Sequence, residues 1–462
     1  DSAQSCLIRR AASQPRPIFS NDAFDDSTIP ERVTDMTGER KLQRTIGLPG
    51  AIVLGLGSMV GTGAFIAIGL AAGIVDDLVW IAVLIGGSLA MLNGLSSARL
   101  AARHPVSGGT YEYGYRELHP SIGVGAGWLF LTAKTASAAT ASMGIAGYIA
   151  ESFGATSPPT WSLGLPILAM AALAIIGLRC SLLATTVLVS LAIAALLGFI
   201  AWGLGTSTIA TPTEVSRPTP SSIDLLHAAA LVFVAFTGYG RIATLGEEIR
   251  DPARSIPLAV VVTVLVSAAL YLLVGLAATN VVGGAAFGDL ARSADGPLIA
   301  TAQAGGGGWL VIPLAIGACA AMGGVLLNLI LGLSRVVLAM GRRHDLPPSL
   351  ARVGNGGPVI AIVVVAATVL IVATTGSMLT AWSGSAAAVL AYYAITNLAA
   401  ARMSLRDGQR AAATASGLGA LACIVVACSL PAAAWGPPII ALLAGLCLSV
   451  LSRVLRPVRS SK

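Results

Sequence analysis

Long runs of apolar residues recur along this chain of 462 residues. The first run, at 46–72, contains no Asp, Glu, Lys or Arg. A helix needs about 20 apolar residues to cross the hydrocarbon core of a bilayer, and each backbone amide in that layer must bond within the protein. Because the runs are continuous rather than alternating, they predict membrane-spanning helices and not the strands of a barrel.

The composition agrees with a membrane protein. Apolar residues make up 55% of the chain and charged residues 11%, whereas a soluble domain carries roughly 25% charged residues. We therefore predict an all-α polytopic membrane protein with about 12 transmembrane helices. The predicted spans lie near 46–72, 79–98, 122–150, 162–178, 181–204, 223–246, 257–280, 307–341, 358–375, 379–400, 412–430 and 434–452.

The basic residues lie almost entirely on one side of this predicted topology. The exceptions among the 28 Lys and Arg residues are Lys134, Arg217, Arg241 and Arg292. The loops of the opposite side hold Asp76, Asp77, Glu151, Glu214, Asp289 and Asp295. The positive-inside rule places the basic side in the cytoplasm. We therefore predict an integral protein of the plasma (inner) membrane with both termini cytoplasmic, and no nucleic-acid partner despite the net charge of +7.

Neither the cysteines nor the histidines are spaced like a metal or disulfide site. The six cysteines form no CxxC motif and lie mostly in or beside predicted spans, where cysteine behaves as a small apolar residue. The four histidines are scattered. We therefore expect no metal, no cofactor, no catalytic residue and no enzymatic activity.

The N-terminal segment 1–40 is polar, mixed in charge and poor in periodic apolar residues. Such a segment cannot bury enough apolar surface to fold, so we predict a disordered cytoplasmic tail. No apolar run follows its early arginine pair, which argues against a signal peptide. Met36 heads a polar segment, so the sequence leaves open whether 1–35 belongs to the native product.

Glycines interrupt two of the predicted spans near mid-depth. The first span contains Gly55-Leu-Gly-Ser-Met-Val-Gly-Thr-Gly63, and the sixth contains Phe236-Thr-Gly-Tyr-Gly240. Glycine costs about 1 kcal/mol relative to alanine in a helix, so clustered glycines favour an unwound turn. The two spans lie five spans apart, so the second five-span unit is inverted relative to the first. Paired interrupted helices in inverted halves indicate a substrate site at the membrane midplane.

The same glycines have a simpler interpretation. Gly57 and Gly61 form a GxxxG pattern, and such glycines usually let two helices pack closely. A lone cluster would favour close packing, whereas the matched pair favours broken helices. With broken spans, the chain divides into a first repeat at 41–205, a second repeat at 206–400, and two appended spans with a basic cytoplasmic tail at 401–462.

Three segments resemble one known family. They are Arg40-Lys41-Leu-Gln-Arg44 with Gly61-Thr-Gly-Ala-Phe65, then Phe236-Thr-Gly-Tyr239 with Glu247-Glu248-Ile-Arg-Asp-Pro252, and Ser334-Arg335 with Asp345-Leu-Pro347. In this order and spacing they resemble the first, sixth and eighth spans of the amino acid–polyamine–organocation (APC) transporters, and the likeness covers nearly the whole chain from about residue 40 onward.

The resemblance implies a LeuT-type fold, which is a 5+5 inverted repeat with discontinuous spans 1 and 6, and an amino acid as substrate. Backbone N–H groups at the first break would bind its carboxylate, because a helix N-terminus favours an anion. Backbone carbonyls beside both breaks would bind its ammonium group, and two aromatic residues, Phe236 and Tyr239, would cover its side chain. The implied substrate residues are Ser58, Met59, Gly61, Thr62, Gly63, Phe236, Thr237, Gly238 and Tyr239.

Two cations lie within the predicted spans. Gly240 and Arg241 follow the sixth-span motif, where many relatives carry an acid, and Lys134 lies midway along span 3. Ionisable residues inside the membrane are expensive and mark function by default. Because no Asp or Glu lies in the core of a span, a dicationic substrate would lack a counter-charge. We therefore favour neutral amino acids, with acidic ones as an alternative.

Coupling and gating have two interpretations each. A desolvated lysine gives up its proton more readily than an exposed one, so Lys134 could carry a coupling proton, or it could be a structural lysine. Proton coupling or exchange is favoured over sodium, because Leu and Val surround Asn328 in span 8.

Glu247 and Glu248 face the basic stretch that includes Arg44. These charges could hold an inner gate shut or be ordinary solvated charges.

The leading hypothesis is a secondary active transporter that moves amino acids by alternating access. A carrier of another small solute, such as an amine, a cationic amino acid or a nucleobase, is the alternative on the same fold. A channel would need a polar lining along several helices, and the predicted spans show none. The predicted partners are a small-molecule substrate, a possible coupling proton and the lipid bilayer, and the sequence leaves the oligomeric state undetermined.

Overall fold

The computed structural model describes residues 46–106, 108–153, 158–206, 219–244, 248–293, 296–354 and 357–454. The predicted tail at 1–40 lies outside these ranges, as do Arg44 and Glu247 of the predicted inner gate. Within the described ranges the chain forms helices, and its β contacts are two isolated bridges. The prediction of an all-α fold is therefore confirmed for this part of the chain.

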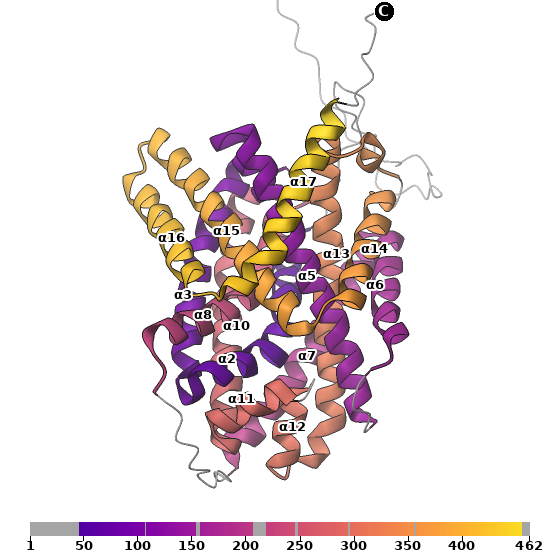
Figure 1. Cartoon of the computed structure of the whole chain (residues 1–462), viewed down its shortest axis with the longest axis vertical. Coiled ribbons are helices and arrows are strands. Elements are labelled where there is room, and N and C mark those ends of the chain that lie inside the picture. Colours follow the sequence, from indigo (N-terminus) through magenta and orange to yellow (C-terminus); the bar gives the residue numbers. More distant parts are fainter. Residues whose placement is uncertain are drawn as a thin grey trace, which may run out of the picture. The chain divides into compact units, whose positions relative to one another are not determined.

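The α-helices are arranged as a bundle of long and short segments (Figure 1). Their bounds are α1 (Leu48–Met59), α2 (Ile68–Val75), α3 (Val79–Arg103), α4 (Thr110–Tyr113), α5 (Pro120–Ser152), α6 (Gly164–Ile176), α7 (Leu178–Gly205), α8 (Ser222–Phe236), α9 (Gly240–Thr244), α10 (Pro252–Val282), α11 (Gly284–Ser293), α12 (Pro297–Ala304), α13 (Val311–Arg342), α14 (Val359–Thr375), α15 (Met378–Arg406), α16 (Arg410–Cys428) and α17 (Gly436–Val454).

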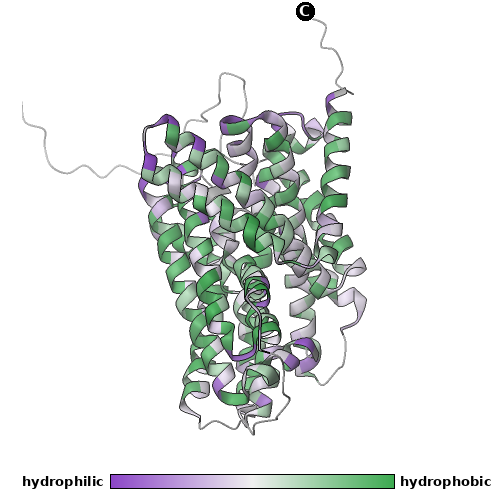
Figure 2. Cartoon of the chain, turned by 60° about the vertical axis from the view of Figure 1, so that its left-hand side comes forward, coloured by the Kyte–Doolittle hydropathy of each residue, from purple (hydrophilic) through white to green (hydrophobic). Residues whose placement is uncertain are grey.

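Eight helical segments of the described chain are long and apolar enough to cross a membrane. They are Leu48–Arg103, Cys180–Gly205, Ser222–Ile242, Pro252–Val282, Gly308–Arg342, Met378–Arg406, Arg410–Cys428 and Ala432–Arg453. The shorter apolar helices Thr160–Ile176 and Val359–Thr375 coincide with two further predicted spans. Helix α5 covers predicted span 3 but is less apolar, because it carries Lys134 and many Ser, Thr and Gly residues. The polytopic membrane character is confirmed, and apolar residues follow the long helices along their length (Figure 2).

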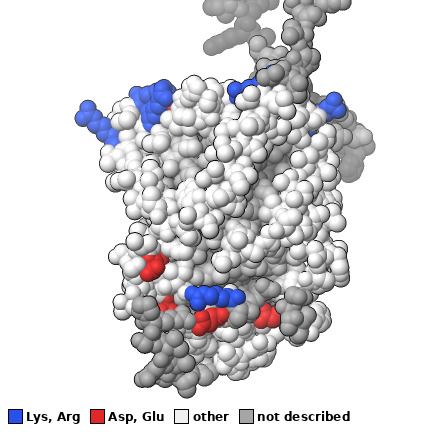
Figure 3. Space-filling model, viewed as in Figure 1, with Lys and Arg blue, Asp and Glu red and all other residues white. Residues whose placement is uncertain are grey.

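One face of the molecule is apolar between two charged zones (Figure 3). Large side chains such as Trp80, Leu168, Ile312 and Ile440 are exposed. Figure 3 shows Lys and Arg along the upper edge of one face, a mixed group of charges lower down, and a broad band without charged side chains between them. An exposed apolar band of this extent is typical of a lipid-facing surface.

The first predicted break is present in the structure. Helix α1 ends at Met59, and Val60 leaves the helical region with a ψ of 83°. The chain then forms a π-helical turn over Gly63–Ala67 before α2 begins at Ile68. The glycine cluster thus interrupts the helix near the middle of its apolar stretch.

The second predicted break faces the first. Helix α8 ends at Phe236, and a 3₁₀ turn over Thr237–Tyr239 separates it from α9. A Cβ atom at Gly238 would lie 2.5 Å from the carbonyl carbon and oxygen of Ser58. Because only glycine lacks Cβ, this close approach of the two broken segments requires glycine at position 238.

The glycines of the first span also pack closely against other helices. A Cβ at Gly61 would collide with the side chain of Val325 on α13, and one at Gly55 would lie 2.5 Å from Cγ2 of Thr263 on α10. Both interpretations of the glycine cluster therefore hold, since the same segment breaks its helix and packs tightly.

Backbone hydrogen bonds join the start of α1 to the segment between α9 and α10. The amide of Ile46 donates to the carbonyl oxygen of Glu248 over 3.0 Å, and the amide of Arg250 donates to that of Ile46 over 2.8 Å. This bridge fixes Glu248 at the same end of the bundle as the beginning of the first span.

Candidate functional site

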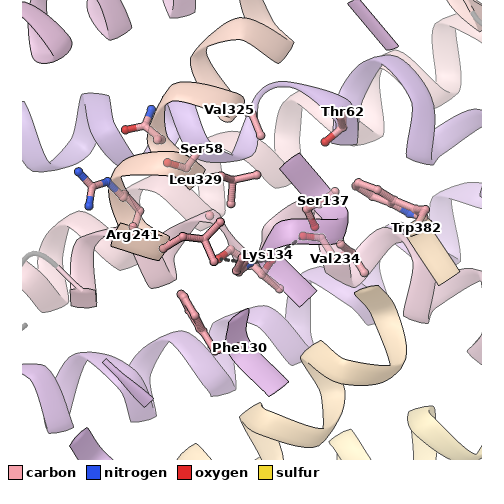
Figure 4. A pocket seen from close by; sticks show the side chains of 16 residues that line it. Ser58, Thr62, Phe130, Lys134, Ser137, Val234, Arg241, Val325, Leu329 and Trp382 are labelled. Atoms are coloured by element: carbon pink, nitrogen blue, oxygen red, sulfur yellow. Dashed lines mark hydrogen bonds between the residues drawn. The ribbon is translucent and has the colours of Figure 1, made fainter. Parts of the chain in front are cut away.

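A small cavity lies where the two broken segments meet α5, α13 and α15 (Figure 4). Its volume is about 30 Å³. A water molecule needs about 10–15 Å³ of such volume, so the cavity has room for about two waters and none for an amino acid. The structure therefore shows this site in a contracted form. The predicted site residues that line it are Ser58, Thr62, Lys134, Thr237, Gly238 and Arg241.

Lys134 connects α5 to the second break. Its Nζ donates to Oγ1 of Thr237 over 2.6 Å and to the carbonyl oxygen of Thr237 over 3.4 Å. The Thr237 hydroxyl in turn donates to the carbonyl oxygen of Val234 over 2.6 Å. Burying an ammonium group is costly unless hydrogen bonds compensate it. The 5% exposed Lys134 side chain therefore depends on the unwound turn for its acceptors.

Asn328 of α13 supplies an acceptor to the cavity. Its Nδ2 donates to the carbonyl oxygen of Gly324 over 2.9 Å and to Oγ1 of Thr185 over 3.5 Å. Its Oδ1 is buried and accepts no hydrogen bond from the described residues. A buried carbonyl oxygen without a donor is costly, so this atom suits a ligand that brings a donor.

A buried ion pair lies at one side of this site. Nε of Arg335 on α13 donates to Oε1 of Glu248 over 3.0 Å, and the two side chains are only 4% and 2% exposed. Glu248 also attracts Arg241 electrostatically. Glu248 therefore forms its ion pair with Arg335 of α13. Sequence reasoning missed the pair, because the two residues are far apart in the chain.

Five of the predicted substrate residues do not line the cavity. Tyr271 of α10 donates a hydrogen bond to the carbonyl oxygen of Met59 over 2.6 Å, and its ring packs on Phe236 with the ring centres 4.8 Å apart. Tyr239 packs against Tyr393 instead, with ring centres 5.4 Å apart. The residues outside the lining are Met59, Gly61, Gly63, Phe236 and Tyr239.

Several residues line the cavity without a sequence signal for a site, and three of them are Phe130, Ser137 and Trp382. Phe130 and Ser137 project from α5 on either side of Lys134, and Trp382 comes from α15 (Figure 4). The indole of Trp382 donates to the carbonyl oxygen of Leu231 over 3.3 Å. These residues look like ordinary core positions in the sequence, and only helix packing brings them to the breaks.

A second charged cluster lies outside the eight apolar segments. Glu112 of α4 accepts hydrogen bonds from Nε of Arg343 over 2.7 Å and from Nε of Arg116 over 2.9 Å. Burial by itself would raise the pKa of Glu112, but these hydrogen bonds lower it below the ordinary value. Tyr111 donates to Asp345 over 2.6 Å beside it, so α4 is tied to the end of α13.

The cavity combines a few polar groups with a mostly apolar lining. Among the described residues no group of His, Cys, Asp and Glu is arranged to hold a metal ion. The lining instead offers an ammonium group, a guanidinium group, hydroxyls, an amide and the backbone of two broken helices. Such groups can bind a small zwitterion through hydrogen bonds and charge.

The chain is similar to known transport proteins. The family model described as "Amino acid permease" matches residues 50–433. An uncharacterized transporter of Mycobacterium tuberculosis is 36% identical over 396 residues, which cover 85% of this chain and 87% of that protein.

Two relatives with more specific names are more distant. The branched-chain amino acid permease of Bacillus subtilis is 28% identical over 356 residues, which cover 72% of this chain and 75% of that protein. A chloroplastic cationic amino acid transporter of Arabidopsis thaliana is 30% identical over 346 residues, which cover 69% of this chain and 58% of that protein. These matches and the apolar helices identify an integral membrane transporter and not an enzyme. The chain therefore belongs to the amino acid permease family.

Proposed function

We propose that this protein is a secondary active transporter that moves amino acids, neutral ones foremost, across the plasma membrane by alternating access. The observation that carries the proposal is the cavity, with its few polar groups, at the meeting point of two broken helices. Interrupted helices expose backbone donors and acceptors at membrane depth, which is tolerated where they line a cavity. A substrate with both a carboxylate and an ammonium group can use both kinds of backbone group.

The proposed architecture has twelve spans in a 5+5 inverted repeat, with repeats at 41–205 and 206–400 and two further spans at 401–462. The breaks after Met59 and Phe236 support this layout, because they fall in the first span of each proposed repeat. The charge asymmetry of the loops supports cytoplasmic termini.

In the proposed binding mode, the carboxylate binds backbone N–H groups at the first break, within Gly61, Thr62 and Gly63; Thr62 already lines the contracted cavity, and the two glycines join it when the site opens. The ammonium group binds Oδ1 of Asn328 and the carbonyl oxygens beside the two breaks. Oδ1 of Asn328 needs a donor, which supports this orientation. Tyr271 already donates to the carbonyl of Met59 in the contracted form, so that carbonyl would join only after Tyr271 moves.

The charge of the cavity supports the choice of substrate class. The ammonium group of Lys134 and the guanidinium group of Arg241 lie in the lining, and no described lining residue is an acid. A cationic side chain would be repelled by this ammonium group, whereas a neutral side chain would not be. Two relatives carry names that point to branched-chain and cationic substrates. The charges of this cavity disfavour a cationic substrate, so we propose neutral amino acids, with acidic ones as the alternative.

Alternating access requires the contracted cavity to open on one side at a time. We propose that Glu248 and Arg335 close the cytoplasmic side, with Arg241 next to them and with Arg44 and Glu247 as further members of the inner gate. The two buried partners support this role, since removing one partner of a buried pair costs about 3–5 kcal/mol. Opening such a gate costs free energy, and binding of the substrate has to offset that cost.

The proposal is tested by uptake of radiolabelled amino acids into proteoliposomes that contain the full chain. The panel contains leucine, alanine, aspartate and arginine, each with a pH gradient, a sodium gradient, or internal amino acid for exchange. We expect leucine or alanine to accumulate with a pH gradient or by exchange. Uptake of none of the panel in any condition would contradict amino acid transport and favour another small solute.

A further inference from the structure

A second and larger cavity lies outside the proposed substrate site. Its volume is about 600 Å³, and α5, α13, α14, α15 and α17 form its walls. In Figure 1, α17 crosses in front of α5, and α13 and α14 lie beside it. The central part of this face shows no charged side chain in Figure 3. We name this cavity the α14 groove.

The walls of the α14 groove are continuous stripes along their helices. On α14 the stripe consists of Val364, Val365, Thr368, Val372 and Thr375, whose spacing places them on one helix face. At 1.5 Å per residue, the distance from Val364 to Thr375 is about 17 Å. One leaflet contributes about 15 Å to the hydrocarbon core of a bilayer. The groove is therefore about as long as an acyl chain within one leaflet.

Four of the five threonine hydroxyl groups in the wall, all except that of Thr135, donate hydrogen bonds to backbone carbonyl oxygens. Thr132, Thr368 and Thr375 donate to carbonyl oxygens of their own helices, over 2.8, 2.9 and 2.7 Å. Thr380 donates to the carbonyl oxygen of Ser377 over 2.9 Å. No described lining residue is charged. Because four of the five hydroxyl donors are satisfied within the wall and most of the lining is aliphatic or aromatic, the groove suits an apolar occupant rather than a polar one.

We propose that the α14 groove binds one acyl chain of a membrane phospholipid. The groove opens among membrane-spanning helices, its length matches one leaflet, and its surface is apolar. Leu333 of α13 lines both the groove and the small cavity beside Lys134. The bound chain therefore packs against the helices that also form the small cavity.

The test uses the full chain in phosphatidylcholine vesicles that contain a phospholipid with a photoactivatable diazirine on its acyl chain. After illumination, mass spectrometry locates the labelled peptides. We expect labelling to concentrate on α14 and on the stripe of α5 that starts at Trp128, and not on α16, whose Leu421 and Ile424 are also exposed. Equal labelling of all lipid-facing helices would overturn the proposal.

Filling the groove provides the second arm. A Cβ at Gly384 would make only contacts of 3.8–3.9 Å, so a side chain can begin there without a clash, and Gly384→Leu adds apolar volume to the groove. Ala136→Leu fills the groove from the opposite wall and replaces Gly384→Leu in the test if that variant fails to fold. Gly417→Leu on α16 is the matched control, because a Cβ there has nothing within 4 Å.

We expect either groove variant to lose the concentrated labelling and Gly417→Leu to keep it. Concentrated labelling that persists in both groove variants would overturn the proposal. So would the absence of lipid labelling together with crosslinks between two copies of the chain through α14, because the occupant would then be a second copy.

Discussion

Nζ of Lys134 on α5 lies 2.6 Å from Oγ1 of Thr237, at the turn that separates α8 from α9. One hydrogen bond thus ties an intramembrane cation to an interrupted helix. The break provides the acceptors that the ammonium group needs, and the ammonium group in turn holds the turn against α5. A change in the charge of Lys134 should therefore alter the turn at Thr237, and a change in that turn should alter how Lys134 is held.

Replacing the acceptor tests this dependence. Thr237→Val keeps the shape of the side chain but leaves Lys134 without its short hydrogen bond. A buried donor that loses its partner costs about 1–3 kcal/mol. We expect Thr237→Val to lower the thermal unfolding temperature and to impair uptake, while Thr237→Ser retains both. Equal behaviour of the two variants would show that the hydroxyl does not matter.

Replacing the cation tests the proposed coupling role. Lys134→Met removes the only group in the described cavity lining that combines a transferable proton with contact to the second break. We expect uptake by this variant to lose its response to a pH gradient and to retain exchange of internal for external amino acid. Undiminished pH-driven uptake by Lys134→Met would exclude Lys134 as the proton carrier.

The sequence predicts the backbone of this site better than its side chains. Clustered glycines mark both breaks, because a missing Cβ has local consequences that can be read along the chain. Gly238 illustrates this, since its contact with Ser58 leaves no room for any other residue. Lys134 is equally visible, because a cation inside an apolar run is rare.

The contacts that complete the site depend on packing between distant helices. The Arg335 partner of Glu248, the lining role of Trp382 and the donor from Tyr271 to Met59 each join residues far apart in the chain. Each residue has an ordinary explanation by itself in the sequence. Their combination follows only from the relative positions of α1, α10, α13 and α15.

The buried pair of Glu248 and Arg335 is expected to stabilise the contracted form. Removing one partner of a buried ion pair costs about 3–5 kcal/mol, because the other charge stays buried. We expect Glu248→Ala to lower the thermal unfolding temperature strongly, and the double variant Glu248→Ala with Arg335→Ala to be more stable than the single one. A double variant that is less stable than Glu248→Ala would contradict this coupling.

The cluster around Glu112 predicts a pH effect on stability. The pKa of Glu112 is lowered in the folded protein. Its contribution to the free energy of unfolding is therefore fully present above the pKa of the unfolded state, about 4.3, and is lost as the pH falls through the pKa of the folded state. We expect Glu112→Gln to unfold at a lower temperature than wild type at neutral pH. The difference should shrink as the solution is acidified below pH of about 4.

An exposed ion pair is the control for this effect. Arg103 and Asp407 lie 3.2 Å apart with side chains 58% and 29% exposed, and exposed pairs contribute about 0–1 kcal/mol. We expect Asp407→Asn to change the unfolding temperature little at any pH. A difference between wild type and Glu112→Gln that stays constant through acid pH would show that ionisation of Glu112 is not its cause.

The central claim is that amino acids bind where the two broken helices meet, and glycine substitutions test it most directly. The measurement is the exchange of radiolabelled amino acid in proteoliposomes by wild type, Gly61→Leu, Gly238→Leu and the control Gly417→Leu, with insertion checked by protease protection. The proposed site predicts that both break variants insert but lose exchange, while Gly417→Leu behaves like wild type. Exchange at the wild-type rate by both break variants would contradict a substrate site between the two breaks.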